Sequence, residues 1–457
     1  MNFIEQLIAA LWNRPSRLGR GARRESGGAN LGNIVRDGEV TRRSLSLSDT
    51  RRTMHLAVLG KTGTGKSKFI EHLIAQDIEN ERGFIVFDLH GEITPWAIRT
   101  VNARERKERR HLSDKLIVIS PSDPEMSVGW NPLEQTSPDF VRIAEFAQVL
   151  RARWGLDHFG ARTDELLRNA LFVLAANGLT LLELSLLLTH NGFRAACLKK
   201  VANSEVRQYF ELRYDQASEP MRATMREPIL NKTSAFTADP HFRHIVGQPK
   251  STFSIKTAMD EGHWILIDLN KGRLGEQALT LGSLFFLMIA NAIFSRQKRS
   301  LFTIYCDEIQ NFVSRDIGLE TVLSESRKFG VSLVSANQYL DQYPAEIRAA
   351  ILSVGTQVFF QLSGSDATQI AQLLDGGKPL AESLKNLQRR HAIVKSGADR
   401  WVEIAVPTVP DPKVDPIDLV NRTRYSWGRV RARVDLDIAK RQAEYRQKSD
   451  EVLNDWE

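Results

Sequence analysis

The sequence predicts an α/β protein with a mainly parallel sheet and an inserted all-helical domain. Short apolar runs recur along the chain, as is typical of strands that are buried on both faces of a sheet. Helical segments lie between many of these runs, which favours parallel strands joined by crossover helices. One long stretch, from about residue 136 to 250, has helical periodicity and almost no strand signal.

Eight apolar runs are the candidate strands of the sheet. They are His55–Leu59, Phe84–Asp88, Leu116–Ile119, Trp264–Leu269, Leu301–Cys306, Val331–Ser335, Gln357–Leu362 and Ala392–Lys395. Residues 33–47 alternate in polarity around Asp37-Gly38, which predicts a short β-hairpin. The predicted organisation is a helix and Arg-rich linker (1–29), the hairpin (30–53), the α/β domain (54–135 and 251–410), the all-α insertion (136–250) and a basic, helical tail (411–457).

The composition is that of a soluble globular protein. The 457 residues are 26% charged and 42% hydrophobic, which argues against overall disorder. The net charge of +7 favours an anionic partner without naming one. The two cysteines, Cys197 and Cys306, suit neither a disulfide framework nor a zinc site, so we expect a cytoplasmic protein. We find no cleavable signal peptide, and the apolar stretch Gln277–Ser295 is interpreted as a buried core helix.

The N-terminal segment combines an apolar helical face with positive charge. Residues 2–12 place apolar side chains at helical spacing, and five arginines follow before residue 25. Such a segment suits a peripheral contact of residues 2–24 with the inner face of an anionic membrane, docking to a partner protein, or packing on its own domain. All three interpretations remain open.

The strongest motif is a complete phosphate-binding loop. It consists of Gly60, Lys61, Thr62, Gly63, Thr64, Gly65, Lys66 and Ser67, which match G-x-x-x-x-G-K-S. The glycines allow backbone N–H groups to surround phosphate oxygens, and the following helix offers its N-terminus to the same anion. We therefore expect ATP at this loop, with Lys66 at the β- and γ-phosphates and Ser67 as a Mg²⁺ ligand.

Such a loop requires a metal-holding acid on a neighbouring strand of the sheet. Asp307 and Glu308 follow the apolar run that begins at Leu301. Asp307 is predicted to hold Mg²⁺, and Glu308 to act as the general base on the attacking water. Asp268 is the second candidate for the metal-holding acid because it has no adjacent glutamate, and Asp88 is the third.

Two further residues are candidates for sensing or completing the site. Gln338 follows a buried strand, where ligands of open α/β sheets bind, so it is a candidate γ-phosphate sensor. Arg327 precedes Gly330 near a predicted helix end, where a cation is favoured for electrostatic reasons alone. It is also a candidate arginine finger that reaches the ATP of a neighbouring subunit.

Taken together, the motifs resemble the FtsK/HerA superfamily of DNA-pumping ATPases, and within it the type IV secretion (conjugative) coupling proteins. The resemblance spans about residues 30 to 410. It rests on Leu59–Ser67, Phe87–Glu92, Asn131-Pro132-Leu133, Asp307–Phe312, Arg327–Gly330 and Asn337-Gln338. It implies a RecA-like P-loop NTPase core, an inserted all-α domain, and a hexameric ring with DNA in its pore. It also favours Arg327 as the finger in trans and Gln338 as the sensor.

The resulting functional prediction is a DNA-stimulated ATPase that translocates DNA without sequence specificity. The transmembrane anchor of coupling proteins and the fuller N-terminal β-barrel of HerA-type proteins are not recognised here. The expected setting is therefore DNA transfer beside a relaxase or secretion-system partner, or a defence or repair complex with a nuclease. A nucleotide-gated recruitment platform for a protein partner is the alternative from another class. A P-loop kinase fits less well, because it gives the helical insertion no role.

Overall fold

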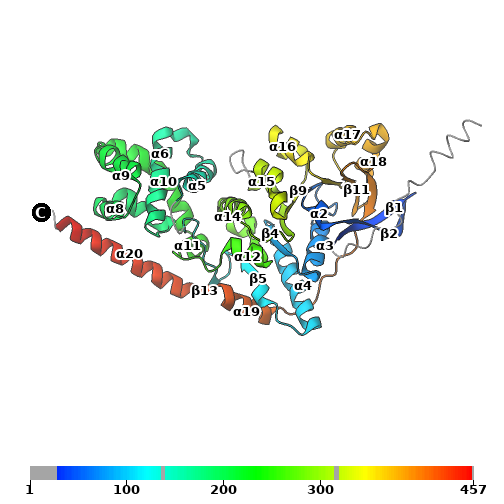
Figure 1. The fold of residues 1–457 in the computed structure, drawn as a ribbon, viewed down its shortest axis with the longest axis horizontal. Helices are drawn as coiled ribbons and strands as arrows, with labels where there is room; N and C mark the ends of the chain where they lie inside the picture. Colours follow the sequence, from blue (N-terminus) through cyan, green and yellow to red (C-terminus); the bar gives the residue numbers. More distant parts are fainter. Residues whose placement is uncertain (1–27, 135–138, 313–318, 455–457) are drawn as a thin grey trace, which may run out of the picture.

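A single eleven-stranded sheet forms the centre of the protein (Figure 1). The computed structural model describes residues 28–134, 139–312 and 319–454. The strand order is β2-β1-β12-β11-β10-β3-β9-β8-β4-β7-β5. The strands are β1 (Ala29–Arg36), β2 (Glu39–Leu47), β3 (Leu56–Leu59), β4 (Gly83–Asp88), β5 (Leu116–Ile119), β7 (Trp264–Asp268), β8 (Phe302–Asp307), β9 (Val331–Asn337), β10 (Thr356–Phe359), β11 (His391–Ser396) and β12 (Val402–Ala405).

Seven neighbouring strands, from β10 to β5, are parallel, which confirms the predicted α/β class. Each of the eight predicted strands is present, with ends shifted by at most a few residues. Strands β3, β4, β8, β9 and β10 are buried at every position, as their continuous apolar character requires.

Helices cover both faces of the sheet. On one face α3 (Lys66–Glu79) and α4 (Ile93–Glu108) pack on alternate residues of the strands, and α14 (Gln277–Phe294) packs on the other face. Among the described residues, α14 is the one helix long and apolar enough to cross a membrane, and 78% of that stretch is buried within the protein. Its Phe285 stacks on Trp130 with ring centroids 4.0 Å apart. The interpretation of Gln277–Ser295 as a core helix is therefore confirmed.

The remaining helices of the α/β region flank the sheet. They are α2 (Asp49–Arg52), α12 (Ile255–Glu261), α13 (Lys271–Leu274), α15 (Leu319–Glu325), α16 (Ala345–Leu352), α17 (Gly364–Leu373) and α18 (Gly377–Asn386). The predicted hairpin is present as β1 and β2, with Asp37 and Gly38 at positive φ in its turn. It joins the main sheet, because β1 pairs with β12, a strand that the sequence did not predict.

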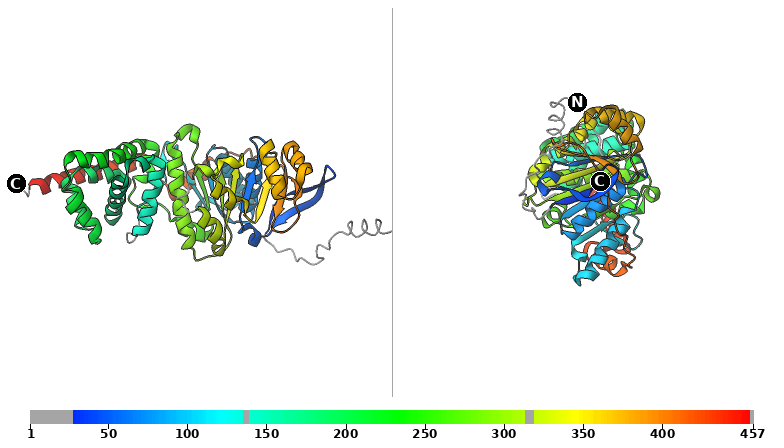
Figure 2. Two further views of the ribbon diagram at one scale, coloured as in Figure 1. Left: turned by 90° about the horizontal axis from the view of Figure 1, so that it is seen from above. Right: turned by 90° about the vertical axis from the view of Figure 1, so that its right-hand side faces the viewer.

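A helical region lies beside the sheet along the long axis of the molecule (Figure 2). It contains α5 (Phe140–Trp154), α6 (Ala161–Ala176), α7 (Leu184–Thr189), α8 (Asn191–Leu198), α9 (Ser204–Gln208), α10 (Glu219–Thr237) and α11 (Pro240–Val246). The described part of residues 139–250 holds helices and no strand. We retain 136–250 as the proposed limits of the insertion. The predicted N-terminal helix, residues 2–12, lies outside the described residues.

The C-terminal segment packs back along the molecule. After α19 (Ile417–Trp427), the short strand β13 (Arg429–Val430) pairs with β6 (Met126–Ser127), and α20 (Arg431–Asn454) runs along the helical region (Figure 1). Four arginines of this basic segment have partners inside the chain. They pair as Arg422 with Glu105, Arg424 with Asp123, Arg429 with Asp437, and Arg431 with His244. Three of these pairs tie the tail to the rest of the chain, and the pair of Arg429 with Asp437 lies within the tail.

A buried ion pair joins α2, which precedes β3, to α3, which follows β3. The Arg52 guanidinium donates to both carboxylate oxygens of Asp77 at 2.6 and 2.7 Å, and both side chains are at most 1% exposed. The hydroxyl of Tyr305 on β8 donates to the same carboxylate at 2.6 Å. Three elements that position the nucleotide loop and its acids are thus tied together beneath the site.

Replacing Arg52 with methionine is expected to destabilise the protein by about 3 kcal/mol, because the buried Asp77 would lose its bidentate partner and keep only the longer ion pair with Arg82 at 3.7 Å. Urea unfolding followed by tryptophan fluorescence measures the loss. Arg51→Met is the matched control, since the Arg51–Asp399 pair is half exposed and should contribute less than about 1 kcal/mol. Equal stability of the two variants would show that the buried pair does not hold these elements together.

Candidate nucleotide site

The predicted phosphate-binding loop connects β3 to the first turn of α3. Gly63 and Gly65 have φ of 79° and 123°, a region that side chains disfavour. At Gly60 a Cβ atom would lie 2.5 Å from the Cβ of Phe360, so a side chain does not fit there. The N-terminus of α3 has no side-chain cap, which leaves its N–H groups available to an anion.

Lys66 and Ser67 face the inside of this loop. The Lys66 ammonium donates to the carbonyl oxygens of Gly60 at 2.6 Å and Lys61 at 3.1 Å. Burial lowers the pKa of Lys66, and the nearby Asp307 and Glu308 partly offset that effect. The ammonium is therefore held within the loop, close to where the phosphates of a nucleotide would lie.

Asp307 lies at the carboxyl end of β8, beside the start of α3. The Ser67 hydroxyl donates to a carboxylate oxygen of Asp307 at 3.4 Å. Burial raises the pKa of Asp307, and Lys66 and His90 counter this only in part. A buried carboxylate beside a hydroxyl offers the oxygen ligands that Mg²⁺ prefers, and a divalent cation would restore the charged form. These two residues therefore fit the predicted metal site.

Glu308 is linked to the phosphate-binding loop through Gln338. The Gln338 amide donates to Glu308 Oε1 at 2.6 Å, and the Thr62 hydroxyl donates to Gln338 Oε1 at 3.0 Å. Asn311 donates to Glu308 Oε2 at 3.2 Å, and His90 Nε2 lies 3.9 Å from Oε1. Glu308 itself has φ of 57°. Each carboxylate oxygen of Glu308 therefore accepts a hydrogen bond, and the Gln338 bridge places the carboxylate beside the phosphate-binding loop.

The strand order explains how these side chains meet. We expected the acids on a strand next to β3, but β9 lies between β3 and β8. Because all three strands are parallel, their carboxyl ends lie at one edge of the sheet and bring Asp307, Glu308 and Gln338 to the loop. The site is therefore built across three strands.

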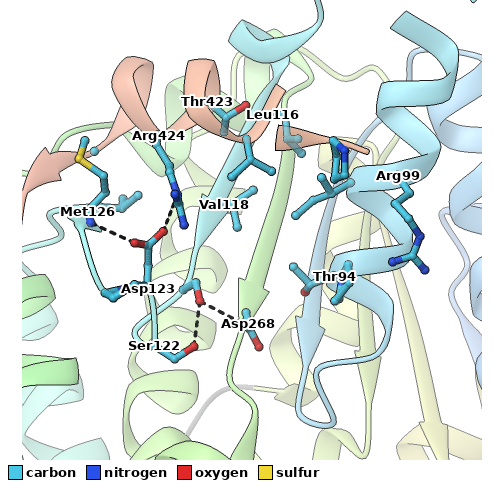
Figure 3. Close-up of a pocket in the computed structure, with 18 of the residues that line it drawn as sticks. Thr94, Arg99, Leu116, Val118, Ser122, Asp123, Met126, Asp268, Thr423 and Arg424 are labelled. Atoms are coloured by element: carbon cyan, nitrogen blue, oxygen red, sulfur yellow. Dashed lines mark hydrogen bonds and ion pairs between the residues drawn. The ribbon is translucent and has the colours of Figure 1, made fainter. Parts of the chain in front are cut away.

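The two rival acids lie elsewhere. Asp268 is at the end of β7, four strands from β3 in the sheet order, and accepts a hydrogen bond from Ser120 at 3.0 Å. It lines a separate cavity of about 390 Å³ between α4, β5 and α19 (Figure 3). The Asp88 carboxylate accepts from the backbone N–H groups of Gly91 and Thr94, so it caps α4. The geometry thus favours Asp307 over Asp268 and Asp88 as the metal-holding acid.

Arg327 lies at the opposite edge of the sheet from the loop. It is exposed, in the turn Ser326–Phe329 that precedes β9, whereas Gln338 follows the other end of that strand. A seven-residue strand is about 23 Å long. Arg327 is therefore remote from the nucleotide loop of its own chain, and any contact with ATP would involve a neighbouring subunit.

The structure adds residues that the sequence did not indicate. The backbone N–H of Arg390 donates to the Thr64 carbonyl at 2.7 Å, and its own carbonyl accepts from Val406. Arg390 has φ of 69° and lies against Gly65. It supports the loop from the antiparallel side of the sheet. No local pattern marks it, because its role depends on backbone groups and on contacts distant in sequence.

A comparison with known families identifies the chain. The family model described as the helicase HerA central domain matches residues 29–272, more than half of the sequence. The chain belongs to this family. It is an FtsK/HerA-type P-loop ATPase, as the motifs had indicated. No curated protein matches the sequence.

Solved structures share the fold of this HerA family member. The plasmid coupling protein TrwB with an ATP analogue has a TM-score of 0.60 and 17% identity, covering 84% of this chain and 95% of that chain. TrwB with ADP and Mg²⁺ has a TM-score of 0.57 at the same identity, covering 84% and 95%. VirB4 of Thermoanaerobacter pseudethanolicus has a TM-score of 0.54 and 17% identity, covering 84% and 98%.

Proposed function

We propose that this protein is an ATP-driven DNA translocase that works as a hexameric ring. The observation that carries the proposal is the meeting of Lys66, Ser67, Asp307, Glu308 and Gln338 at one edge of the sheet. This set contains a group for each task in phosphoryl transfer to water: binding phosphate, holding a metal, activating water and sensing the γ-phosphate. A site with its general base in place favours turnover over simple nucleotide binding.

Each side chain has a separate task in this proposal. The loop N–H groups and Lys66 bind the phosphates of ATP, while Ser67 and Asp307 hold Mg²⁺, which neutralises charge that develops during transfer. Glu308 accepts the proton of the attacking water. Gln338, which bridges Thr62 and Glu308, reports to the base whether the γ-phosphate is present. TrwB, of similar fold, binds ADP with Mg²⁺ and an ATP analogue.

Arg327 is proposed to complete the site of the neighbouring subunit. Its exposure and its position at the amino end of β9 suit contact across a subunit interface. A contact between unlike faces of identical subunits is heterologous, and it closes into a ring when the rotation permits. The ring and the finger are therefore two parts of one hypothesis.

DNA is the proposed cargo, and stimulation by DNA separates this function from a recruitment platform. ATP hydrolysis is expected to rise at least severalfold with DNA of any sequence, because phosphate contacts carry no sequence information. The effect should fall steeply between 50 and 200 mM salt, because counterions released into a more concentrated salt solution gain less entropy. The assay compares no DNA, single-stranded DNA and duplex DNA at both salt concentrations.

Lys66→Ala protein, purified in parallel, is the control for contaminating ATPases. Hydrolysis that ignores DNA but responds to a protein partner would favour the platform instead. A strong preference for one short sequence would also contradict a translocase, because a motor that moves along DNA meets every sequence.

A further inference from the structure

His55 forms an unusual junction at the amino end of the strand that leads into the nucleotide loop. Its imidazole is buried, at 3% exposure, and both ring nitrogens are engaged. Nδ1 accepts the backbone N–H of Leu333 at 3.0 Å, so Nε2 carries the proton and donates to the carbonyl of Leu323 at 3.0 Å. Both bonds require the neutral ring, and burial lowers the pKa of His55 to about 4.

The segment that presents Arg327 consists of α15 and the turn Ser326–Phe329 after it. One partner of His55 belongs to this segment, and the other belongs to β9, the strand that follows it. Leu323 lies in the last turn of α15, whose final carbonyl groups lack partners within the helix. Leu333 lies in β9 just before its pairing with β3, which begins at Leu56 and Val334. The imidazole thus caps α15 and extends the β3–β9 ladder at the same time.

The backbone of His55 is itself fixed. Its N–H donates to the carbonyl of Arg52, its carbonyl accepts from Thr356 of β10, and its φ is 67°. The far end of the Arg327 segment is also held. The Arg296 guanidinium donates to the Phe329 carbonyl at 2.9 Å, and the Gly330 N–H donates to the Arg327 carbonyl at 3.1 Å. Arg327 therefore lies between two anchored points.

We propose that His55 is a positioning residue, which ties the segment presenting Arg327 to the strand that leads into the chain's own nucleotide loop. The inference rests on the proposed role of Arg327 as a finger in trans. Only the four residues of β3, Leu56–Leu59, separate His55 from Gly60 at the start of the loop. A shift of the loop on nucleotide binding is thereby passed along one short strand to the arginine offered to the neighbour.

His55→Ala is expected to lower kcat ten- to a hundredfold. The variant would let Arg327 shift slightly, and a small misplacement of a group that acts on the transition state lowers the rate by about this factor. The Kd for a fluorescent ATP analogue should stay within about threefold of the wild-type value, since the substitution leaves the nucleotide loop intact. His263→Ala is the matched control. His263 is also a buried histidine beside a strand start, with Nδ1 3.3 Å from the Ala258 carbonyl, and it should keep the wild-type kcat.

Two more variants separate hydrogen bonding from packing. His55→Phe keeps a ring but loses both hydrogen bonds, so it should resemble His55→Ala and serves in its place if the alanine variant does not assemble. His55→Gln keeps a donor and an acceptor and is expected to recover most of the wild-type kcat. A glutamine variant as slow as the phenylalanine variant would overturn the assignment of the two hydrogen bonds.

Mixed rings provide the decisive readout. His55→Ala mixed with Lys66→Ala should regain hydrolysis. The His55→Ala subunit supplies an intact nucleotide loop, and the Lys66→Ala subunit supplies a correctly placed Arg327. His55→Ala mixed with Arg327→Ala should not, because neither subunit presents a working finger. If the His55 variant assembles into rings but hydrolysis recovers in neither mixture, the proposal is overturned.

The same experiment distinguishes this inference from the function on which it rests. Recovery between Lys66→Ala and Arg327→Ala tests the finger in trans alone. If that pair recovers and the His55→Ala with Lys66→Ala pair does not, only the role of His55 is wrong. If neither pair recovers, the finger in trans fails and the role of His55 fails with it.

Discussion

Glu308→Gln is expected to stop ATP turnover while leaving ATP bound. The amide cannot accept the proton of the attacking water, and the loss of a general base typically costs about a hundred- to ten-thousandfold in rate. Lys66, Ser67 and Asp307 remain in place, so the affinity for ATP should change little. Phosphate release measures the rate, and equilibrium binding of a fluorescent ATP analogue measures the affinity.

Two control variants give this result its meaning. Glu382→Gln makes the same change at an exposed residue that pairs with Lys385, and it should hydrolyse ATP at the wild-type rate. Asp268→Asn tests the rival acid and should also stay active, because Asp268 lines the cavity beside β5. If Glu308→Gln remains active and Asp268→Asn is inactive, the assignment of the acids is wrong.

The motifs of the site could be read from the sequence because each is local. The loop from Gly60 to Ser67 needs particular residue types at fixed spacing, since glycine conformation and a helix N-terminus create the phosphate site. Asp307 and Glu308 follow a strongly apolar strand, which marks the ligand-binding edge of a parallel sheet. The parallel strands themselves are recognisable because both their faces are buried.

The arrangement of those pieces could not be read in the same way. No local sequence pattern indicates that β9 lies between β3 and β8, or that the hairpin joins the sheet through β12. The path of α20 along the helical region depends on contacts such as Val434 and Ile438 with Leu182, far apart in sequence. Arg390 and His55 act through backbone groups and long-range hydrogen bonds, which periodicity and motif spacing do not encode.

Arg327→Ala is expected to have an effect as large as the loss of the base. An arginine finger contributes about 10³ to 10⁵ in rate, or roughly 4–7 kcal/mol of transition-state stabilisation. ATP binding should persist, because Arg327 lies at the edge of the sheet opposite its own loop. Lys328→Ala is the matched control, since the neighbouring Lys328 is also exposed and pairs with Glu325 on the same segment.

The decisive form of this test mixes two inactive proteins. In rings assembled from equal amounts of Arg327→Ala and Lys66→Ala, about a quarter of the interfaces join an intact loop to an intact finger when subunits combine at random around a heterologous ring. Hydrolysis should therefore reappear on mixing, although each variant alone is inactive. A finger acting in cis predicts no recovery, because every subunit then carries a damaged site. Full activity in isolated monomers of the wild-type protein would contradict the finger in trans directly, since no neighbour is present to supply Arg327.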